Sequence, residues 1–289
     1  MAARSSSSSS QPSIINNDEE ETFTLYPETL KAKLGKMLVT CHKNHERPEG
    51  RGYIVDKILC GGAVNRLSDC FYGANFNPPK KRRGKCMSSR EWGIKFHRQI
   101  FHRYKCFSES KNSCLCEQKF HVKTKAARKD TKMHQQLEAF EKFLDKNKWK
   151  VYDCELVVGW SEIKCATSLD VVCVDDLCNP HEFYVIELKT GYTQRYQART
   201  IDSSGMMKGA CGKEIKNSYA NHHQLQLWFG VECLKRTYNI DTAAAVVLYI
   251  KEDGKYKADY AADWWFKDLK MKKKLGDQLC GKISTFSLY

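Results

Sequence analysis

The sequence predicts an α/β fold with a mixed central sheet flanked by helices. Apolar residues recur at helical spacing in two early segments and one late segment, whereas four other segments are continuously apolar and rich in β-branched residues. The elements therefore follow the order helix, helix, three strands, helix, strand, which favours helices packed on the faces of a sheet. Their expected ranges are 90–106, 133–147, 150–159, 163–174, 182–191, 214–238 and 243–250.

The first helix is predicted by Trp92, Phe96 and Ile100, which recur every four residues and form one apolar stripe. His97 lies beside that stripe, and Gly93, one turn earlier, leaves room for a close approach. A lone histidine on a helix is more often structural than a ligand, so both roles stay open on the residues alone. A second apolar stripe predicts the next helix and consists of Met133, Leu137, Phe140 and Leu144.

The three consecutive strands each carry charged residues among apolar ones. In the first strand, alternation puts Asp153, Glu155 and Val157 on one face. Asp170 stands in the middle of the second strand. In the third strand the carboxylate at 187 and the ammonium at 189 are two positions apart, so they project to the same face.

A turn-like cluster at 175–180 separates the second and third strands, so we expect these strands to pair antiparallel. Asp170 then lies beside Glu187 and Lys189. Burying these charges is costly unless each is paired or binds an ion, and an ion pair near a strand end is the simpler interpretation. Two carboxylates at one point also suit Mg²⁺ or Mn²⁺. The lysine would then orient an attacking water or offset charge on a phosphate.

This arrangement of residues resembles a known family. Asp170, followed after a gap by Glu187-Leu188-Lys189-Thr190-Gly191, resembles the signature of the PD-(D/E)XK nuclease superfamily. The form of the signature is similar to that of the RecB-type branch, which includes the lambda-type exonucleases. One departure is that Thr167-Ser168-Leu169 fills the place of the small loop that usually precedes the aspartate, which leaves the local geometry open.

Three further segments support the resemblance, which covers about residues 88–265. Gly93 to His97 resembles an early G-x-x-x-H motif, whose histidine is a metal ligand in the family. Glu155 stands where such nucleases often carry a glutamate. Gln224 to Trp228 is similar to a Q-L-x-x-Y motif, with tryptophan in place of tyrosine.

The resemblance implies a restriction-endonuclease-like core and a divalent-metal-dependent DNA nuclease, with exonuclease action in recombination, repair or viral genome processing. The implied cofactor is Mg²⁺ or Mn²⁺. Lys189 would orient or activate the water, and Gln224 would support it. Endonuclease action and RNA as a substrate stay open. The residues assigned to the site are Asp170, Glu187, Lys189, Gln224 and Glu155 as catalytic groups, and Asp170, Glu187, the Leu188 carbonyl and His97 as metal ligands.

The chain carries a net charge of +14, nearly all of it in one segment. Between Lys80 and Lys132 there are 17 Lys and Arg residues and 4 Asp and Glu residues, a balance of +13. Concentrated positive charge attracts polyanions, so DNA is the expected partner, and a solvated basic face is the alternative. The residues expected to contact nucleic acid are Lys80, Lys81, Arg82, Arg83, Arg195, Arg199, Lys208 and Lys213.

Three regions are expected along the 289 residues. Residues 1–22 are serine-rich and then acidic, which is typical of a disordered tail. Residues 23–87 form an N-terminal cap region, in which Gly61-Gly62 marks a turn, and residues 88–289 form the nuclease-like domain. The basic run from Pro78 to Lys85 is typical of a nuclear localisation signal, so we expect a nuclear protein, and otherwise a cytoplasmic one.

The remaining observations concern membranes and cysteines. No apolar run approaches the roughly 18–20 residues that cross a membrane, and a serine run stands where a signal peptide needs an apolar core. The 14 cysteines are therefore expected as reduced thiols. Cys106, Cys114 and Cys116, with His102 or His121, suit a zinc-stabilised adaptor, although no C-x-x-C pair is present. A basic DNA-binding protein that does not cut is the other rival. A homo-oligomer or a recombination partner protein also stays open.

Overall fold

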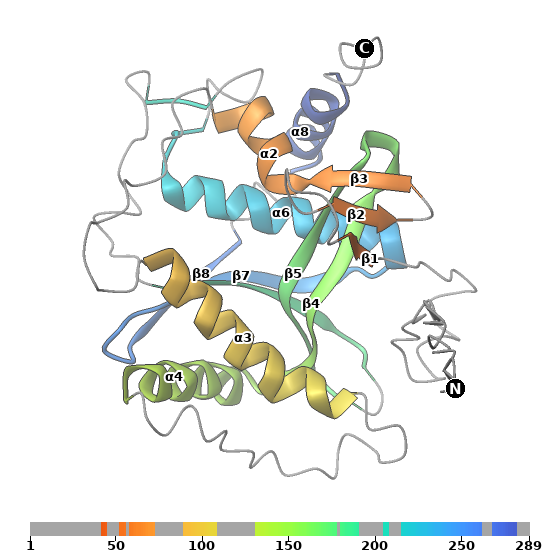
Figure 1. Cartoon of the computed structure of the whole chain (residues 1–289). Coiled ribbons are helices and arrows are strands. Elements are labelled where there is room, and N and C mark those ends of the chain that lie inside the picture. The colour runs from red at the N-terminus through yellow and green to blue at the C-terminus, as the bar shows by residue number, and fades with distance from the viewer. Residues whose placement is uncertain are drawn as a thin grey trace, which may run out of the picture.

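A mixed sheet between two layers of helices forms the centre of the molecule (Figure 1). The structure is a computed structural model, and it describes residues 42–44, 52–55, 58–72, 89–108, 131–177, 180–190, 205–207, 215–261 and 268–281. Helices α2 (Ala63–Leu67), α6 (Tyr219–Tyr238) and α8 (Leu269–Gly281) pack on one face of the sheet. Helices α3 (Ser89–Ser108) and α4 (Thr131–Asn147) pack on the other face. Within the described ranges, no helix combines the length and apolarity needed to span a bilayer.

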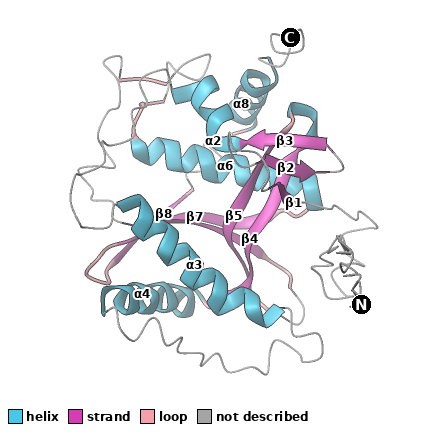
Figure 2. Ribbon diagram, in the orientation of Figure 1, coloured by secondary structure: helices cyan, strands magenta, loops and turns pink. Residues whose placement is uncertain are grey.

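Among the described residues, the sheet has eight strands, seven of them in the order β1-β2-β3-β5-β6-β7-β8. The eighth strand, β4, pairs with the other edge of β5 (Figure 2). The β3–β5 and β6–β7 pairs are parallel and the other pairs are antiparallel, so the sheet is mixed as predicted. The strands are β1 (His42–Asn44), β2 (Gly52–Val55), β3 (Ile58–Gly62), β4 (Lys150–Trp160), β5 (Cys165–Val174), β6 (Phe183–Thr190), β7 (Thr242–Ile250) and β8 (Tyr256–Tyr260).

The predicted order of elements is confirmed from α3 to β7. The apolar stripes of α3 and α4 lie against the sheet, where Phe96 and Phe140 are fully buried. Helix α6 starts later than predicted because Ser218 is its N-cap, and the Ser218 side chain accepts a hydrogen bond from the Asn221 backbone N–H at 3.4 Å. Helix α8 was not predicted, although its buried apolar residues belong to the α6-side core.

The predicted turn at Gly61-Gly62 is wrong, because both residues end strand β3. They pair in parallel with Cys165 and Ala166 at the start of β5. After β3 the chain enters α2 and then a π-helical segment, η1 (Ser68–Tyr72), which buries Tyr72 in the α6-side core. Residues 58–72 therefore contribute a strand and core side chains to the same sheet as the later strands.

Side-chain alternation along β4 and β5 breaks at one level of the sheet. Cys154 and its partner Val171 face α3 and α4, whereas the next pair, Leu156 and Leu169, faces α6. The residue between Cys154 and Leu156 is Glu155, whose φ is +56°. Left-handed backbone is uncommon for a non-glycine residue and costs about 1–3 kcal/mol. The prediction that Glu155 shares one face of β4 with Asp153 and Val157 is therefore wrong. The irregular backbone at Glu155 lies directly opposite Asp170.

Strand β2 crosses β4 at a glycine, which gives a stability prediction. A Cβ added at Gly159 would lie 2.6 Å from Val55 Cγ2. Gly159→Ala is therefore expected to lower the free energy of unfolding by about 1–3 kcal/mol, because β-branched Val55 cannot move aside. Thermal unfolding measures this loss. Adding Val55→Ala removes the clashing methyl groups, so the double variant should lose less than the sum of the single losses. Strict additivity would mean that β2 does not pack there.

Candidate metal centre

One edge of strand β5 pairs with two different strands. Its first residues pair with β3, and only Val171–Val174 pair with β6. The two neighbours therefore separate near Asp170, and this opens a fork in the sheet. The Leu188 N–H lies just beyond the last β5–β6 pair and donates to Asp170 Oδ2 at 2.7 Å. The carboxylate thus replaces a strand-to-strand hydrogen bond at the fork.

The stretch before Asp170 is strand rather than loop. Thr167, Ser168 and Leu169 pair with residues of β4 without interruption. The Ser168 hydroxyl donates to Glu155 Oε2 at 2.9 Å, which fixes one oxygen of that carboxylate. Where the family motif has a small loop before its aspartate, this chain has a β-strand with a hydrogen-bonding serine.

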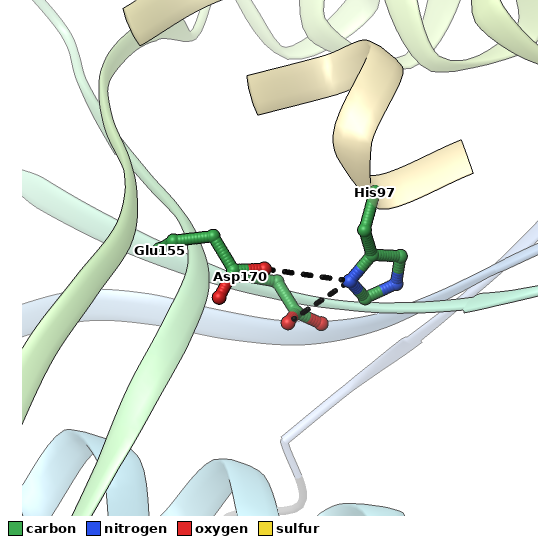
Figure 3. Close-up of side chains that lie close together, drawn as sticks. All are labelled: His97, Glu155 and Asp170. Carbon is green, nitrogen blue, oxygen red and sulfur yellow. Dashed lines mark ion pairs between the residues drawn. The ribbon is translucent and has the colours of Figure 1, made fainter. Parts of the chain in front are cut away.

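Three potential metal ligands meet at the fork (Figure 3). His97 Nδ1 lies 3.4 Å from Asp170 Oδ1 and 3.7 Å from Glu155 Oε1. One ligand atom of each residue lies within 4.8 Å of the others, and the three side chains are only partly exposed, at 26%, 19% and 12% for His97, Glu155 and Asp170. Two carboxylate oxygens and one imidazole nitrogen are a donor set that suits Mn²⁺, and the oxygens suit Mg²⁺.

Glu187 and Lys189 lie on the α6 side of the same fork. Lys189 Nζ is 2.5 Å from Glu187 Oε1, and their side chains are 16% and 14% exposed. The predicted ion pair between neighbouring same-face residues is therefore present. Among the described residues, the group of three potential ligands contains Glu155 and does not contain Glu187. The predicted ligand set had Glu187 in this place.

The electrostatics of the fork disfavour an additional negative charge. Burial, together with the nearby Asp170 carboxylate, raises the pKa of Glu187 to about 7 despite the attraction of Lys189. Burial lowers the pKa of His97, but the Asp170 charge and hydrogen bonds to Asp170 and Glu155 outweigh it and raise this pKa to about 10. Both shifts share one physical cause, because the carboxylates of the fork favour a positive charge beside them.

Gly93 explains how α3 brings His97 to the fork. A Cβ at Gly93 would lie 3.3 Å from Thr190 Oγ1, at the end of β6, which is tighter than most such contacts. The glycine of the predicted G-x-x-x-H segment therefore permits a close approach of the helix to the strand that carries Glu187 and Lys189. His97, one turn later, then reaches across to Asp170.

Gly93→Ala is expected to weaken metal binding without lowering the stability of the fold. Alanine gains up to about 1 kcal/mol of helix propensity, while the contact with Thr190 shifts α3 by a few tenths of an ångström. We expect a fall in Mn²⁺ affinity of about 10-fold, measured by calorimetry, with little change in melting temperature. Gly276→Ala in α8 is the matched control, because its Cβ would meet Trp160 at an ordinary 3.6 Å. An equal metal affinity in both variants would contradict this role for Gly93.

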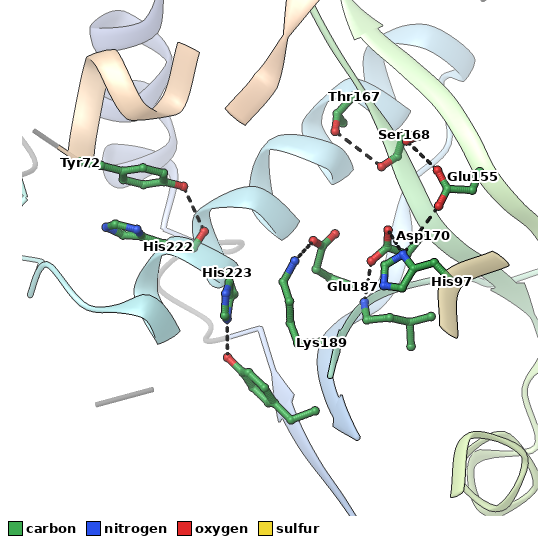
Figure 4. A network of polar contacts seen from close by, with 12 residues as sticks. Tyr72, His97, Glu155, Thr167, Ser168, Asp170, Glu187, Lys189, His222 and His223 are labelled. Carbon is green, nitrogen blue, oxygen red and sulfur yellow. Dashed lines mark hydrogen bonds and ion pairs between the residues drawn. The ribbon is translucent and has the colours of Figure 1, made fainter. Parts of the chain in front are cut away.

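On the α6 side, the structure adds residues that the sequence analysis missed (Figure 4). His223 is 6% exposed, and its Nδ1 lies 3.0 Å from the Tyr249 hydroxyl. Burial, followed by the positive charges of Lys189 and His222, holds the pKa of His223 well below its usual range. Tyr72 stacks on the His222 ring at 3.5 Å and donates to the His222 carbonyl at 3.2 Å. The paired histidines in the apolar α6 segment were the only signal in the sequence.

Among the other predicted residues, Gln224 bonds to strand β8, and several others lie outside the described residues. The Gln224 side chain donates to the Asp259 carbonyl of β8 at 3.2 Å. Trp228 of the Q-L-x-x-Y-like segment is 1% exposed in the α6-side core. The side chain of Cys106 is not described, and Cys114 and Cys116 lie outside the described residues. The same holds for the basic run from Pro78 to Lys85 and for the predicted nucleic-acid contacts Lys80, Lys81, Arg82, Arg83, Arg195, Arg199, Lys208 and Lys213.

Comparison with known proteins leaves the family open. No protein-family model matches this chain, and no curated protein matches it significantly.

Proposed function

We propose that this protein is a divalent-metal-dependent nuclease that hydrolyses phosphodiester bonds in DNA, built on a restriction-endonuclease-like core. The observation that carries the proposal is the meeting of His97, Glu155 and Asp170 at the fork where Glu187 and Lys189 also lie. These residues come from α3, β4, β5 and β6, so four elements converge on one set of charged groups. A structural ion pair needs two partners, whereas this centre gathers three carboxylates.

The residues present fit a hard divalent cation. Glu155 Oε1, Asp170 Oδ1 and His97 Nδ1 face one point, and the second oxygen of each carboxylate is engaged elsewhere, by Ser168 and by Leu188. We propose these three groups as Mg²⁺ or Mn²⁺ ligands, with Glu187 and the Leu188 carbonyl as the further ligands. A bound cation there would supply a water of lowered pKa and neutralise charge on the phosphate.

The chain's own groups would then position the reactants. Lys189 places a positive charge on the α6 side of the fork, 2.5 Å from Glu187, where it can hold a water by hydrogen bonding or offset charge that develops on the phosphate. His97 must lose its proton to bind a metal, so metal binding releases a proton. Sequence features support DNA as the substrate, because the excess positive charge lies in the segment that contains α3. Exonuclease action and nuclear location remain part of this proposal.

The test is digestion of end-labelled linear DNA and of circular DNA with Mg²⁺, Mn²⁺ or EDTA, with a matched RNA alongside. Loss of linear DNA alone, only with metal, supports an exonuclease, whereas cutting of circles as well makes the protein an endonuclease. Tight DNA binding without cleavage under any metal would overturn the proposal. The chain would then be a basic DNA-binding protein that does not cut.

A further inference from the structure

The side of the fork that faces α6 contains an ordered set of polar groups around Lys189. Strands β6 and β7 run parallel, and Lys189 is the register partner of Tyr249. Register partners project from the same face of a sheet, so the lysine and the tyrosine stand side by side under α6. Leu188 and Leu248, the preceding pair, belong to the opposite core. The placement of Lys189 next to Tyr249 therefore follows from strand register.

Helix α6 fixes the tyrosine hydroxyl from above. Tyr249 is 1% exposed, and its hydroxyl oxygen lies 3.0 Å from His223 Nδ1, with the two ring centroids 5.7 Å apart. Lys257 Nζ of β8 lies over the tyrosine ring, 6.0 Å from its centroid. The ring is thus held by a helix and an edge strand. Its hydroxyl has little freedom to move.

His223 also lies within the electrostatic reach of Lys189. The charge of this lysine contributes to the low pKa of His223, after the larger effect of burial. A neutral imidazole beside an ammonium adds no repulsion, and it can hydrogen-bond the tyrosine through one ring nitrogen. Figure 4 shows His223 and Lys189 on the same side of the fork, with Glu187 between Lys189 and Asp170.

Lysine has a flexible stem, and its partner Glu187 is one of the proposed metal ligands. Once the Glu187 carboxylate is shared with a cation, this ion pair alone is a weaker anchor for the ammonium. Fixing a reacting group near its productive position is worth more than a further contact with the substrate. A second anchor that carries no charge would hold Nζ without competing for the metal.

We propose that His223 and Tyr249 form a positioning pair for Lys189, in which the imidazole holds the tyrosine hydroxyl and the tyrosine holds the lysine side chain against Glu187. This inference rests on the proposed nuclease function and assigns to His223 the supporting role that the sequence analysis gave to its neighbour Gln224. The pair acts through Lys189 and touches neither metal nor phosphate. Lys189 also acts electrostatically on His97 of α3, and Asp170 of β5 acts on the Glu187 partner of this lysine.

The experiment uses the full chain and single-turnover cleavage of a labelled DNA duplex at saturating Mn²⁺. We expect Tyr249→Phe and His223→Leu to slow cleavage at least 10-fold, with DNA dissociation constants changed less than 2-fold. His223→Asn, whose amide can replace Nδ1 as a hydrogen-bonding group, should recover the rate to within 3-fold of the wild type. Tyr238→Phe is the control, because Tyr238 of α6 is also a buried tyrosine and its hydroxyl donates to a different group, the Val157 carbonyl, at 3.3 Å.

A second readout does not depend on cleavage. Reductive ¹³C-methylation of the lysines gives an NMR signal for Lys189, assigned by its loss in Lys189→Arg. Tyr249→Phe should shift and sharpen this signal, whereas Tyr238→Phe should leave it unchanged. Rates within 2-fold of the wild type in Tyr249→Phe, an unchanged Lys189 signal, or His223→Asn as slow as His223→Leu would each overturn the positioning pair. Absence of cleavage by the wild-type protein would instead overturn the nuclease proposal, and the NMR readout would still decide this one.

Discussion

Glu187→Gln and Asp170→Asn are expected to reduce the rate of metal-dependent DNA cleavage by about 10³-fold or more, as loss of a group that acts in the transition state does. Each replacement preserves the size of the side chain and removes one negative charge from the fork. In Asp170→Asn the amide oxygen can still accept the Leu188 N–H, which the carboxylate accepts at 2.7 Å. Both variants should therefore fold, and the loss of rate should arise in the chemical step of cleavage. Single-turnover cleavage of end-labelled DNA measures it.

DNA binding should move in the opposite direction to activity in these variants. Removing a carboxylate makes a chain of net charge +14 more positive, so the dissociation constant for DNA should stay equal or fall. Glu162→Gln is the matched control, since it makes the same chemical change at a side chain that is 66% exposed. Cleavage within 10-fold of the wild type in both fork variants would show that the reaction is centred elsewhere.

Local rules predict that Asp170, Glu187 and Lys189 meet at the fork. Residues two apart on a strand share a face, and strands joined by a short turn pair antiparallel, so Asp170 had to lie near Glu187 and Lys189. Asp175, at the start of the predicted turn, accepts the backbone N–H groups of His181 and Glu182, which lead into β6, through Oδ1. The positions of these residues therefore follow from neighbouring segments of the chain alone.

The rest of the centre depends on contacts between distant segments. Glu155 adopts left-handed backbone within the paired part of β4, and no propensity of glutamate indicates it. The parallel pairing of Gly61-Gly62 with β5 joins segments that are far apart, and a double glycine has the composition of a turn. His223 is one residue from Gln224, and helix rotation alone decides which of them faces Lys189.

The stability of the protein in EDTA should depend on pH. The pKa of Glu187 decides whether stability rises or falls as the pH increases. This pKa rises from 4.5 to about 7 on folding because of burial and the Asp170 charge. A raised pKa of an acid means that its stabilising contribution is complete below 4.5 and is lost as the pH rises through about 7. His97, raised from 6.5 to about 10, begins to lose its contribution above pH 6.5 and loses it fully as the pH rises through about 10, so it adds to the same trend. In EDTA the melting temperature should therefore fall between pH 5 and pH 8.

A bound divalent cation should reverse this loss at pH 8. At a Mn²⁺ concentration of about 100 times its dissociation constant, binding stabilises the folded state by about 2.7 kcal/mol. For a chain of 289 residues that corresponds to a rise in melting temperature of about 4–5 °C. Differential scanning fluorimetry with Mn²⁺, Mg²⁺ and EDTA measures it. A melting temperature that is the same with Mn²⁺ and with EDTA would contradict a metal centre at the fork.

The variant Glu187→Gln distinguishes a metal centre from an ion-pair network that only stabilises the fold. If Glu187 and Lys189 serve stability alone, removing the Glu187 charge breaks a partly buried pair, and the melting temperature in EDTA at pH 8 should fall. At a metal centre the same carboxylate is held near a second one, Asp170, at a cost that the cation offsets. The variant should then be at least as stable as the wild type in EDTA, show a flatter pH dependence, and gain less from Mn²⁺. A substitution that raises stability while it lowers activity indicates a residue that serves function at a cost in stability.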